Sequence, residues 1–347
     1  MVYSDPQFYD EVISDMNFDD LHQSRKTHLD GIAKQGKVMT PLTLLLRLVF
    51  AISRCLHFEY PLFRLFFKPI GGMFDKAIDK AFDNYIPTEQ DVFVCSYFKS
   101  GTNWMMQVAH QIANRGEGEF DDILDVIPWA DCPAPDTTIS LADPRPVQLS
   151  KTGLRVIKTH ARADYVPYND KARYICVVRD PKDVVVSGHY FFGNMLLGSL
   201  MPSIATWVRH SCSKDAVFGH WADFTNSYWP WRERANVLFL RYEDMQDDPQ
   251  GTITRLAEWM SVDLSAEEIE KVREKSTFSY MKSIDHKFYP GEVTPFAKSG
   301  GSMMRSGKKG GSGEVLSLAQ QQAIDASCRE RLAELNSDFP YERYYVE

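Results

Sequence analysis

The chain has 347 residues, of which 44% are hydrophobic and 25% are charged, a composition typical of an ordinary globular protein. Its length fits one large domain or two small ones. Lysine and arginine total 39 against 47 aspartates and glutamates, which gives a formal net charge of -8. This acidic balance argues against a nucleic-acid binder, whose affinity comes mainly from phosphate neutralisation, but it allows a local basic pocket for a small anion.

Cysteine usage and the N-terminal residues predict a cytoplasmic protein. The first twenty residues are acidic and lack the basic start and apolar stretch of a secretory signal. No Cys-x-x-Cys pair occurs, so we expect free thiols in a reducing compartment. No His-Glu-x-x-His motif and no Cys/His cluster with ligand spacing is present, so we expect no metal. The six cysteines are Cys55, Cys95, Cys132, Cys176, Cys212 and Cys328.

The first 85 residues differ in character from the rest of the chain. Residues 1–37 are polar and charged and predict a loosely held extension. Residues 38–74 are very apolar, but no run approaches the ~18 uninterrupted apolar residues of a spanning helix, and Pro61 is expected to break a helix. We favour a buried helical cap; the alternative is a segment in peripheral contact with a membrane. The interrupting charges are Arg47, Arg54, Glu59, Arg64 and Lys68.

After residue 90, short apolar runs alternate with helical stretches. Continuous apolar strands of this kind are typical of a parallel sheet covered on both faces. No linker divides this part of the chain, so the pattern predicts a single α/β domain with a central parallel sheet flanked by helices. Two capping boxes, Ser265/Glu268 and Ser317/Gln320, mark helix starts, and the second opens the last long helix. The expected strands are 92–96, 154–157, 174–178 and 237–240. The expected helices include 103–114, 181–193, 203–212, 217–232, 252–260 and 265–275.

The segment after the first expected strand has the features of an anion-binding loop. In open α/β sheets, ligands bind beyond the carboxyl ends of the strands. Residues 97–104 read Tyr-Phe-Lys-Ser-Gly-Thr-Asn-Trp, so a tight turn leads from the strand into a helix. Backbone N–H groups and the helix N-terminus favour an anion there, and Lys99 adds a full charge. The loop is not a Walker A motif, because no glycine precedes Lys99 at the required distance.

The next three strands also end in polar groups suited to an anionic ligand. Lys158 and His160 follow the second strand, where a histidine beside a cation can act as a general base. Arg179 ends the third strand, and Ser187 lies about two turns into the following helix, so the two side chains could hold one phosphate. Tyr242 follows the fourth strand. Together, the four strand ends predict one anionic ligand at this edge of the sheet.

From about residue 90 to 328, the sequence resembles the cytosolic-type sulfotransferases. Members of this family move a sulfuryl group from PAPS (3′-phosphoadenosine 5′-phosphosulfate) to a hydroxyl or an amine. The matched motifs occur in the family's order: residues 97–104 resemble Y-P-K-S-G-T-x-W, 158–160 match K-T-H, Arg179 and Ser187 match the 3′-phosphate pair, 242–245 match Y-E-D-M, 276–281 resemble T-S-F-x-x-M, and 305–310 resemble R-K-G-x-x-G.

The resemblance implies a role for each matched residue. His160 would accept the acceptor's proton, Lys99 would stabilise the leaving phosphate oxygen, and Lys158 would hold the sulfuryl oxygens. Ser187 would restrain Lys99 until the acceptor is bound. PAPS would be the co-substrate, PAP the product, and no metal would be required. The implied nucleotide-binding residues are Lys99, Ser100, Gly101, Thr102, Asn103, Trp104, Arg179, Ser187, Tyr242, Ser276, Phe278, Arg305, Ser306 and Gly307.

Departures from the family pattern leave some choices open. Phe98 replaces the loop proline, and Ser306 replaces a lysine, so residues 308–313 are an alternative to 305–310 as the C-terminal phosphate loop. A non-catalytic protein that binds PAP, another nucleotide or a lipid is a competing interpretation. A P-loop kinase is less favoured, because the strand ends carry Lys, Arg and Tyr in place of an acidic Mg²⁺ ligand.

The acceptor is expected to be a small molecule. Aromatic residues make up 13% of the chain and concentrate at 190–192 and 228–231, which favours an apolar or aromatic acceptor. The predicted organisation is an N-terminal extension over 1–85 and a sulfotransferase domain over 86–347, with the apolar cap bordering the acceptor entrance. The sequence leaves the oligomeric state open.

Overall fold

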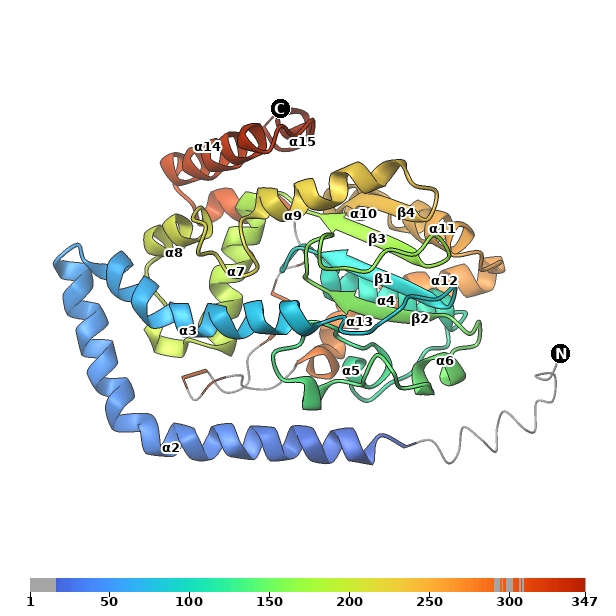
Figure 1. Ribbon diagram of the computed structural model, residues 1–347, viewed down its shortest axis with the longest axis horizontal. Helices are drawn as coiled ribbons and strands as arrows, with labels where there is room; N and C mark the ends of the chain where they lie inside the picture. The colour runs from blue at the N-terminus through green and yellow to red at the C-terminus, as the bar shows by residue number, and fades with distance from the viewer. Residues whose placement is uncertain are drawn as a thin grey trace.

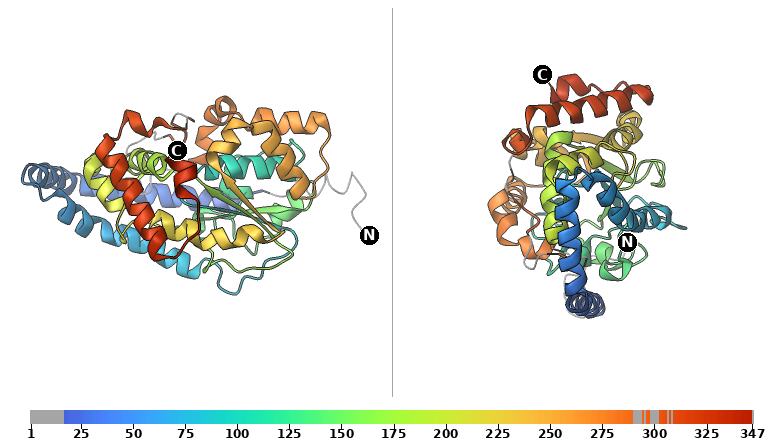
Figure 2. Two further views of the ribbon diagram at one scale, coloured as in Figure 1. Left: turned by 90° about the horizontal axis from the view of Figure 1, so that it is seen from above. Right: turned by 90° about the vertical axis from the view of Figure 1, so that its left-hand side faces the viewer.

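The computed structural model describes residues 17–289, 294, 296–297, 302–305, 307 and 309–346. Its centre is a four-stranded, all-parallel sheet in the order β2-β1-β3-β4 (Figure 1). Helices lie on both faces of this sheet (Figure 2), which confirms the predicted single α/β domain. The strands are β1 (Asp91–Ser96), β2 (Arg155–Thr159), β3 (Arg173–Val178) and β4 (Val237–Arg241).

Alternating side chains of the strands enter two separate hydrophobic cores. Phe93 and Cys95 of β1 belong to one core, whereas Val92 and Val94 belong to the other. A strand that is buried on both faces has no polar side, which is why the sequence shows continuous apolar runs. The register pairs Cys95 with Thr159. It also brings the carboxyl ends of all four strands to one edge of the sheet.

The helices follow the predicted stretches with small shifts at their ends. The capping boxes at Ser265/Glu268 and Ser317/Gln320 are both present. The stretch expected as one helix over 217–232 is divided into two elements, and Pro230 lies in the second, the 3₁₀-helix η3. The bounds are α2 (Asp19–Cys55), α3 (Glu59–Lys80), α4 (Thr102–Ala113), α5 (Ile123–Val126), α6 (Arg145–Leu149), α7 (Pro181–Met195), α8 (Ile204–Ser211), α9 (Trp221–Tyr228), α10 (Tyr242–Asp247), α11 (Pro249–Trp259), α12 (Ala266–Lys275), α13 (Phe278–Ser283), α14 (Leu318–Glu334) and α15 (Tyr341–Tyr345), with 3₁₀-helices η1 (Pro135–Thr137), η2 (Gly198–Leu200), η3 (Trp229–Glu233), η4 (Asp285–Phe288) and η5 (Gly311–Glu314).

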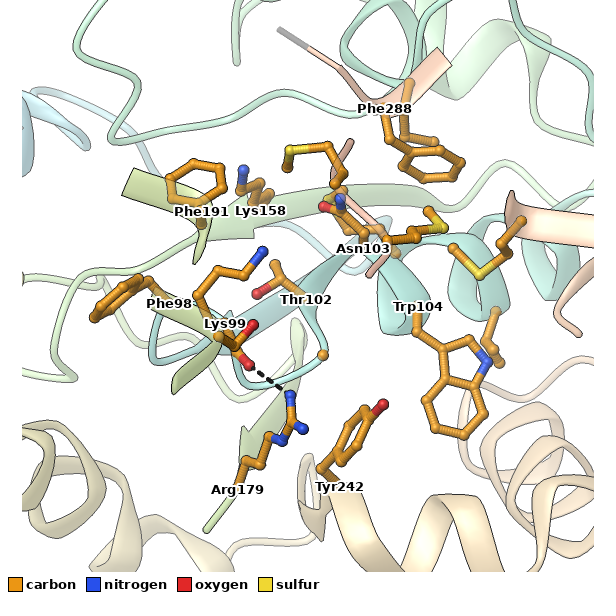
Figure 3. Close-up of a pocket in the computed structure, with 18 of the residues that line it drawn as sticks. Phe98, Lys99, Thr102, Asn103, Trp104, Lys158, Arg179, Phe191, Tyr242 and Phe288 are labelled. Carbon is orange, nitrogen blue, oxygen red and sulfur yellow. Dashed lines mark hydrogen bonds between the residues drawn. The ribbon is translucent and has the colours of Figure 1, made fainter. Parts of the chain in front are cut away.

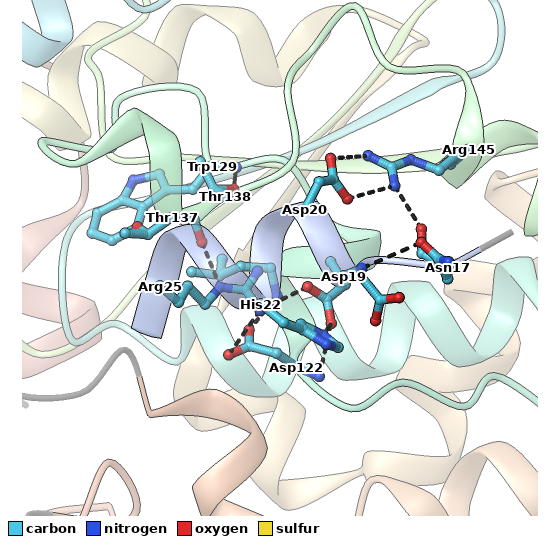
Figure 4. A network of polar contacts seen from close by, with 12 residues as sticks. Asn17, Asp19, Asp20, His22, Arg25, Asp122, Trp129, Thr137, Thr138 and Arg145 are labelled. Atoms are coloured by element: carbon cyan, nitrogen blue, oxygen red, sulfur yellow. Dashed lines mark hydrogen bonds and ion pairs between the residues drawn. The ribbon is translucent and has the colours of Figure 1, made fainter. Parts of the chain in front are cut away.

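The start of α2 is fastened to the domain, contrary to the expectation of a loosely held extension. Within the described part of residues 1–37, Asp19 begins a regular helix. The Arg25 Nη1 atom lies 2.7 Å from a carboxylate oxygen of Asp125, and His22 Nε2 lies 3.0 Å from the other. Asp20 pairs with Arg145 at 3.1 Å (Figure 4). The charged residues that suggested a solvated tail are therefore used for specific pairing, which composition does not reveal.

Replacing Arg25 with methionine should lower the stability of the protein. Only 2% of the Asp125 side chain is exposed, so the substitution leaves a buried carboxylate without its main cation. Breaking a buried pair from one side typically costs about 3–5 kcal/mol. Thermal unfolding is the measurement, and Arg329→Met is the matched control, because Arg329 pairs with Glu342 on the surface. Equal unfolding midpoints for the two variants would show that the Arg25 contacts do not hold α2 in place.

Helix α3 forms the predicted cap over one side of the domain. Phe63, Phe67 and Phe74 are buried in the same core as the helices beneath them. The Phe67 ring centroid lies 5.6 Å from that of Phe192, and the Phe74 centroid lies 4.9 Å from that of Phe218. Pro61 does not break a helix as expected, because it lies in the first turn of α3, where its missing N–H costs no helical hydrogen bond.

The second half of α2 does not fit the cap interpretation. Its apolar side chains are largely exposed, and Leu44, Leu45 and Leu48 each expose more than half of their surface. By length and composition, α2 is also apolar enough to cross a membrane, which corrects the expectation that no segment qualifies. The expectation required an uninterrupted apolar run. The apolar residues of this second half of α2 are numerous enough to make it apolar on average, although two arginines interrupt them.

Candidate active site

A cavity of about 660 Å³ lies beyond the carboxyl ends of the strands. The chain crosses from β2 on one side of β1 to β3 on the other, and such a switch point is where open α/β sheets bind ligands. Five cationic side chains line the cavity of this acidic protein. These are Lys99, Lys158, Arg179, Arg273 and Arg305.

The loop between β1 and α4 places Lys99 at the centre of the cavity (Figure 3). Lys99 and Gly101 both have positive φ angles, of 64° and 95°, and so turn the chain sharply into the helix. The Ser96 and Thr102 hydroxyl oxygens lie 2.7 Å apart and hold the two ends of the loop together. Burial, together with the charges of Arg179 and Lys158, lowers the pKa of Lys99 to about 8. An anion that binds beside such a lysine stabilises its charged form and raises its pKa again.

Alanine at position 101 should disrupt the loop. A Cβ atom there would lie 2.5 Å from Cδ2 of Tyr242. The alanine backbone would also have to keep a φ of 95°, which residues with a Cβ rarely adopt. We expect a lower unfolding midpoint and a clear loss of affinity for the ligand of the cavity, because Tyr242 and the loop cannot keep their contact. Gly219→Ala is the control: its φ is 75°, but a Cβ would meet nothing within 4 Å. A Gly101→Ala protein that loses stability but keeps the affinity of the control would contradict this account.

His160 is held in a single orientation at the end of β2. Its Nδ1 atom lies 2.8 Å from the Ser96 carbonyl oxygen, which can only accept, so Nδ1 carries the proton and donates it. The lone pair of the neutral ring is therefore on Nε2. Burial, followed by the charge of Lys158, lowers the pKa of His160 to about 3. The ring is thus neutral near pH 7, as a general base requires.

The loop of residues 128–146 supports Lys158 and His160 from one side. The Lys158 Nζ atom lies 3.5 Å from the centroid of the Trp129 ring. The Asp131 carboxylate accepts the His160 backbone N–H at 3.0 Å. Burial lowers the pKa of Lys158 to about 8, and the charge of Asp131 opposes this shift. Sequence reasoning missed Trp129 and Asp131, since only their closeness in the fold to the Lys-Thr-His segment gives them a role.

Arg179 joins three parts of the site. It donates a hydrogen bond to the Lys99 carbonyl oxygen at 3.2 Å, and its guanidinium lies 4.3 Å from the centroid of the Tyr242 ring. It also pairs with Asp183, whose carboxylate accepts the backbone N–H groups of Gly310 and Ser312. Asp183 therefore links Arg179 to the C-terminal loop, a connection that sequence spacing did not indicate.

One half of the cavity is suited to a planar base and phosphates. Trp104 and Tyr242 meet edge to face with centroids 5.7 Å apart, and the Trp104 indole donates to the Ser276 carbonyl at 2.9 Å. Phe278 lies against Gly307, which has a φ of 61°. Among the residues that the structure describes, the Ser100 and Ser276 hydroxyls are buried with no hydrogen-bond partner. Buried hydroxyls of this kind are expected where a polar ligand completes their bonding.

The remaining predicted site residues fall on or near the same cavity. Asn103, Ser187 and Arg305 line it, whereas Ser100 is fully buried in the loop between Lys99 and Gly101, which both line the cavity. The Arg305 guanidinium lies 4.6 Å from the centroid of the Tyr190 ring. Ser306 and Lys308 lie outside the described residues. The described contacts favour 305–310 over 308–313 as the phosphate loop, because Arg305 and Gly307 line the cavity while Gly310 and Ser312 are bonded to Asp183.

The other half of the cavity is apolar. Phe98, the residue that replaces the family's proline, packs against Phe192 and Phe218 with ring centroids 5.7 and 5.5 Å away. Phe74 of α3 and Phe191 of α7 complete this wall beside His160. The aromatic stretch 228–231, a second candidate for this wall, lies elsewhere: Tyr228 and Trp231 pack in the core around Tyr174.

Comparisons with known proteins agree with this geometry. The family model described as the sulfotransferase domain matches residues 89–336. Sulfotransferase 2A1 of Rattus norvegicus is 28% identical over 265 residues, covering 76% of this chain and 91% of that protein. The 3-beta-hydroxysteroid sulfotransferase of Cavia porcellus is 24% identical and covers 76% and 91%.

Solved structures show the same fold. Mouse sulfotransferase SULT7A1 complexed with PAP superposes with a TM-score of 0.59 and 23% identity, covering 79% of this chain and 94% of that one. Retinol dehydratase in complex with androsterone and the inactive cofactor PAP gives a TM-score of 0.59 and 20% identity, covering 77% and 88%. Among the described residues of this chain, no three His, Cys, Asp or Glu side chains gather as metal ligands.

Proposed function

The chain belongs to the sulfotransferase family and is a PAPS-dependent sulfotransferase, and we propose that its acceptor is an apolar molecule bearing a hydroxyl group. We further propose that His160 is the general base. The observation that carries this proposal is the placement of His160: its Nδ1 donates to Ser96, its ring centroid lies 5.0 Å from that of Phe218, and it lines the same cavity as Lys99 and Lys158. The acceptor hydroxyl would lie beside Nε2.

The residues of the polar half fit the co-substrate. PAPS, when bound, supplies the sulfuryl group and a phosphate leaving group. Arg179 and Ser187 would hold the 3′-phosphate, while Trp104 and Tyr242 would contact the adenine. Lys99 would lie beside the leaving oxygen on which charge develops, and a preorganised charge at such a position is typically worth ~10²–10³-fold in rate. The buried hydroxyls of Ser100 and Ser276 would gain partners from the nucleotide.

The acceptor class follows from the apolar half. Phe98, Phe191 and Phe218 make one side of the cavity near His160 apolar, so an acceptor would place its carbon skeleton against them and its reacting hydroxyl beside Nε2. The proton would pass from this hydroxyl to His160 Nε2 as its oxygen bonds to sulfur, while the bond from sulfur to the 5′-phosphate oxygen breaks and PAP leaves. Buried apolar area then provides the binding energy, at about 25 cal/mol per Å². The steroid and retinoid names of two relatives support an apolar alcohol as the acceptor.

A panel of alcohols tests this proposal. The protein and PAPS are incubated with sterols, retinoids, long-chain alcohols and phenols, and with polar alcohols of similar size, and sulfated products are measured by mass spectrometry. We expect kcat/KM to rise with the apolar surface of the alcohol. Higher kcat/KM for polar alcohols than for apolar ones would contradict the acceptor assignment, although it would leave the sulfotransferase activity intact.

A further inference from the structure

We propose that the outer arm of the protein, residues 38–65, docks in the plane of an anionic lipid bilayer. This arm consists of the second half of α2, the turn after it and the first turns of α3. Figures 1 and 2 show it at one end of the molecule, where α2 bends before it meets α3. Pro41 and the bond from the Thr40 hydroxyl to the Gly36 carbonyl at 2.9 Å are both features that bend helices.

The first observation is the exposure of large apolar side chains. Among the described residues, eighteen such side chains are exposed, and ten of them lie on the outer arm. Exposed fractions of 58%, 57% and 58% for Leu44, Leu45 and Leu48 are far above those of core residues. A contiguous surface of this kind marks an interaction site. The ten side chains are Val38, Leu42, Leu44, Leu45, Leu48, Val49, Ile52, Leu56, Phe58 and Leu65.

The second observation is the charge around these side chains. Between residues 34 and 68 the chain has six basic residues and a single acidic one, although the whole protein has a net charge of -8. The acidic residue, Glu59, is buried and bonds to Ser203 and Thr206 of the domain. It also pairs with Arg54, and Arg64 pairs with Asp215 of the domain, so the excess of basic charge comes from the other four residues. Leucine and phenylalanine interspersed with basic residues are typical of helices that lie at an anionic membrane surface. The basic residues are Lys34, Lys37, Arg47, Arg54, Arg64 and Lys68.

The third observation favours an arm that lies in the plane of the membrane over a helix α2 that spans it. Before the arm, Arg25 pairs with Asp125 of the domain. At the turn after α2, the Glu59 carboxylate accepts bonds from the Ser203 backbone at 3.0 Å and the Thr206 hydroxyl at 2.7 Å. A spanning helix would place its ends on opposite sides of a ~30 Å hydrocarbon layer. Because one domain holds both ends of α2, the arm lies in the interface.

The same two helices reach the catalytic cavity. His28 of α2 and Phe74 of α3 both line it, so docking of the arm would bring the cavity close to the bilayer. Anionic lipids are concentrated in the cytoplasmic leaflet, the compartment that the free thiols predict. The docking itself does not depend on the identity of the acceptor.

Vesicle flotation of the full chain tests the proposal. The probes are vesicles of phosphatidylcholine alone and vesicles with 30% phosphatidylserine. An environment-sensitive fluorophore on Cys55, the exposed cysteine within the arm, reports its insertion. The test variant combines Leu44→Gln, Leu45→Gln and Leu48→Gln. The matched control combines Ile86→Gln, Leu318→Gln and Val346→Gln, three exposed apolar residues away from the arm. Unfolding midpoints establish that both variants are folded.

We expect the wild type and the control to float with phosphatidylserine vesicles, with a blue shift of the Cys55 label. The test variant should bind at least about tenfold more weakly, because three leucines no longer enter the bilayer. Arg47→Gln with Lys68→Gln should reduce binding by about fivefold per residue. High salt should release the protein.

Three results would overturn the proposal. The first is a wild type that does not float with phosphatidylserine vesicles. The second is a wild-type dimer in light scattering that becomes monomeric in the leucine variant without any vesicle binding, since a second copy would then cover the arm. The third is a bound protein that resists both high salt and alkaline carbonate, because it would then span the bilayer.

Discussion

Replacing His160 with alanine is expected to lower kcat by about 10²–10⁴-fold, the usual contribution of a general base. PAP affinity should stay close to that of the wild type, because His160 bonds to Ser96 and Asp131 and contacts the acceptor side of the cavity. Initial rates at saturating PAPS and calorimetric titration with PAP measure the two quantities. The pKa of His160, lowered by burial to about 3, also predicts no loss of kcat from its protonation between pH 5 and 7.

The opposite result is expected for Arg179→Ala. Arg179 holds the Lys99 carbonyl and contacts Tyr242, so its loss should weaken PAP binding before it affects the chemical step. The pair of variants thus separates binding from catalysis. A His160→Ala enzyme with near-normal turnover would show that another group accepts the proton.

Replacing Lys99 with alanine is expected to lower kcat by about 10²–10³-fold through loss of charge stabilisation at the leaving oxygen. The pKa values of Lys99 and Lys158, each lowered by burial to about 8, add a pH dependence. Both lysines lose their protons as the pH rises through 8 in the free enzyme, so kcat/KM for PAPS should fall above that pH. Bound PAPS favours the charged lysines, so the fall in kcat should occur at higher pH.

A matched control distinguishes this effect from a general change of charge. Lys151 forms an ion pair with Glu117 on the surface away from the cavity, so Lys151→Ala removes a cation without altering the β1–α4 loop or the C-terminal loop. We expect Lys151→Ala to retain kcat and the alkaline limb of the profile. An equal fall in kcat in both variants would contradict the role given to Lys99. So would a wild-type kcat/KM for PAPS that does not change up to pH 10.

The polar half of the site was predictable because it depends on local sequence. Each strand is a continuous apolar run, and the parallel arrangement brings the residues after those runs to one edge. Lys99, Lys158, His160 and Arg179 could therefore be grouped before any coordinates were known. The motif order then gave the co-substrate, which matches the family and the PAP-bound structures with the same fold.

The supporting contacts were not predictable, because they join residues that are distant in sequence. Asp131 holds the backbone of His160, and Asp183 ties Arg179 to the C-terminal loop, yet neither residue belongs to a recognisable motif. From the sequence, Phe98 suggested only a change in the rigidity of the loop, whereas in the fold its ring packs against Phe192 and lines the apolar half of the cavity. Composition also misjudged the start of α2, because paired charges and solvated charges look alike in a sequence.

Thermal unfolding of the wild type as a function of PAP concentration tests the central claim most directly, namely that the four strand ends form one nucleotide cavity. A ligand at ~100 times its dissociation constant adds ~2.7 kcal/mol to the free energy of unfolding. We expect the unfolding midpoint of the wild type to rise steadily from low micromolar PAP upward, and that of Arg179→Ala to rise much less. An unchanged midpoint for the wild type at millimolar PAP would contradict the claim.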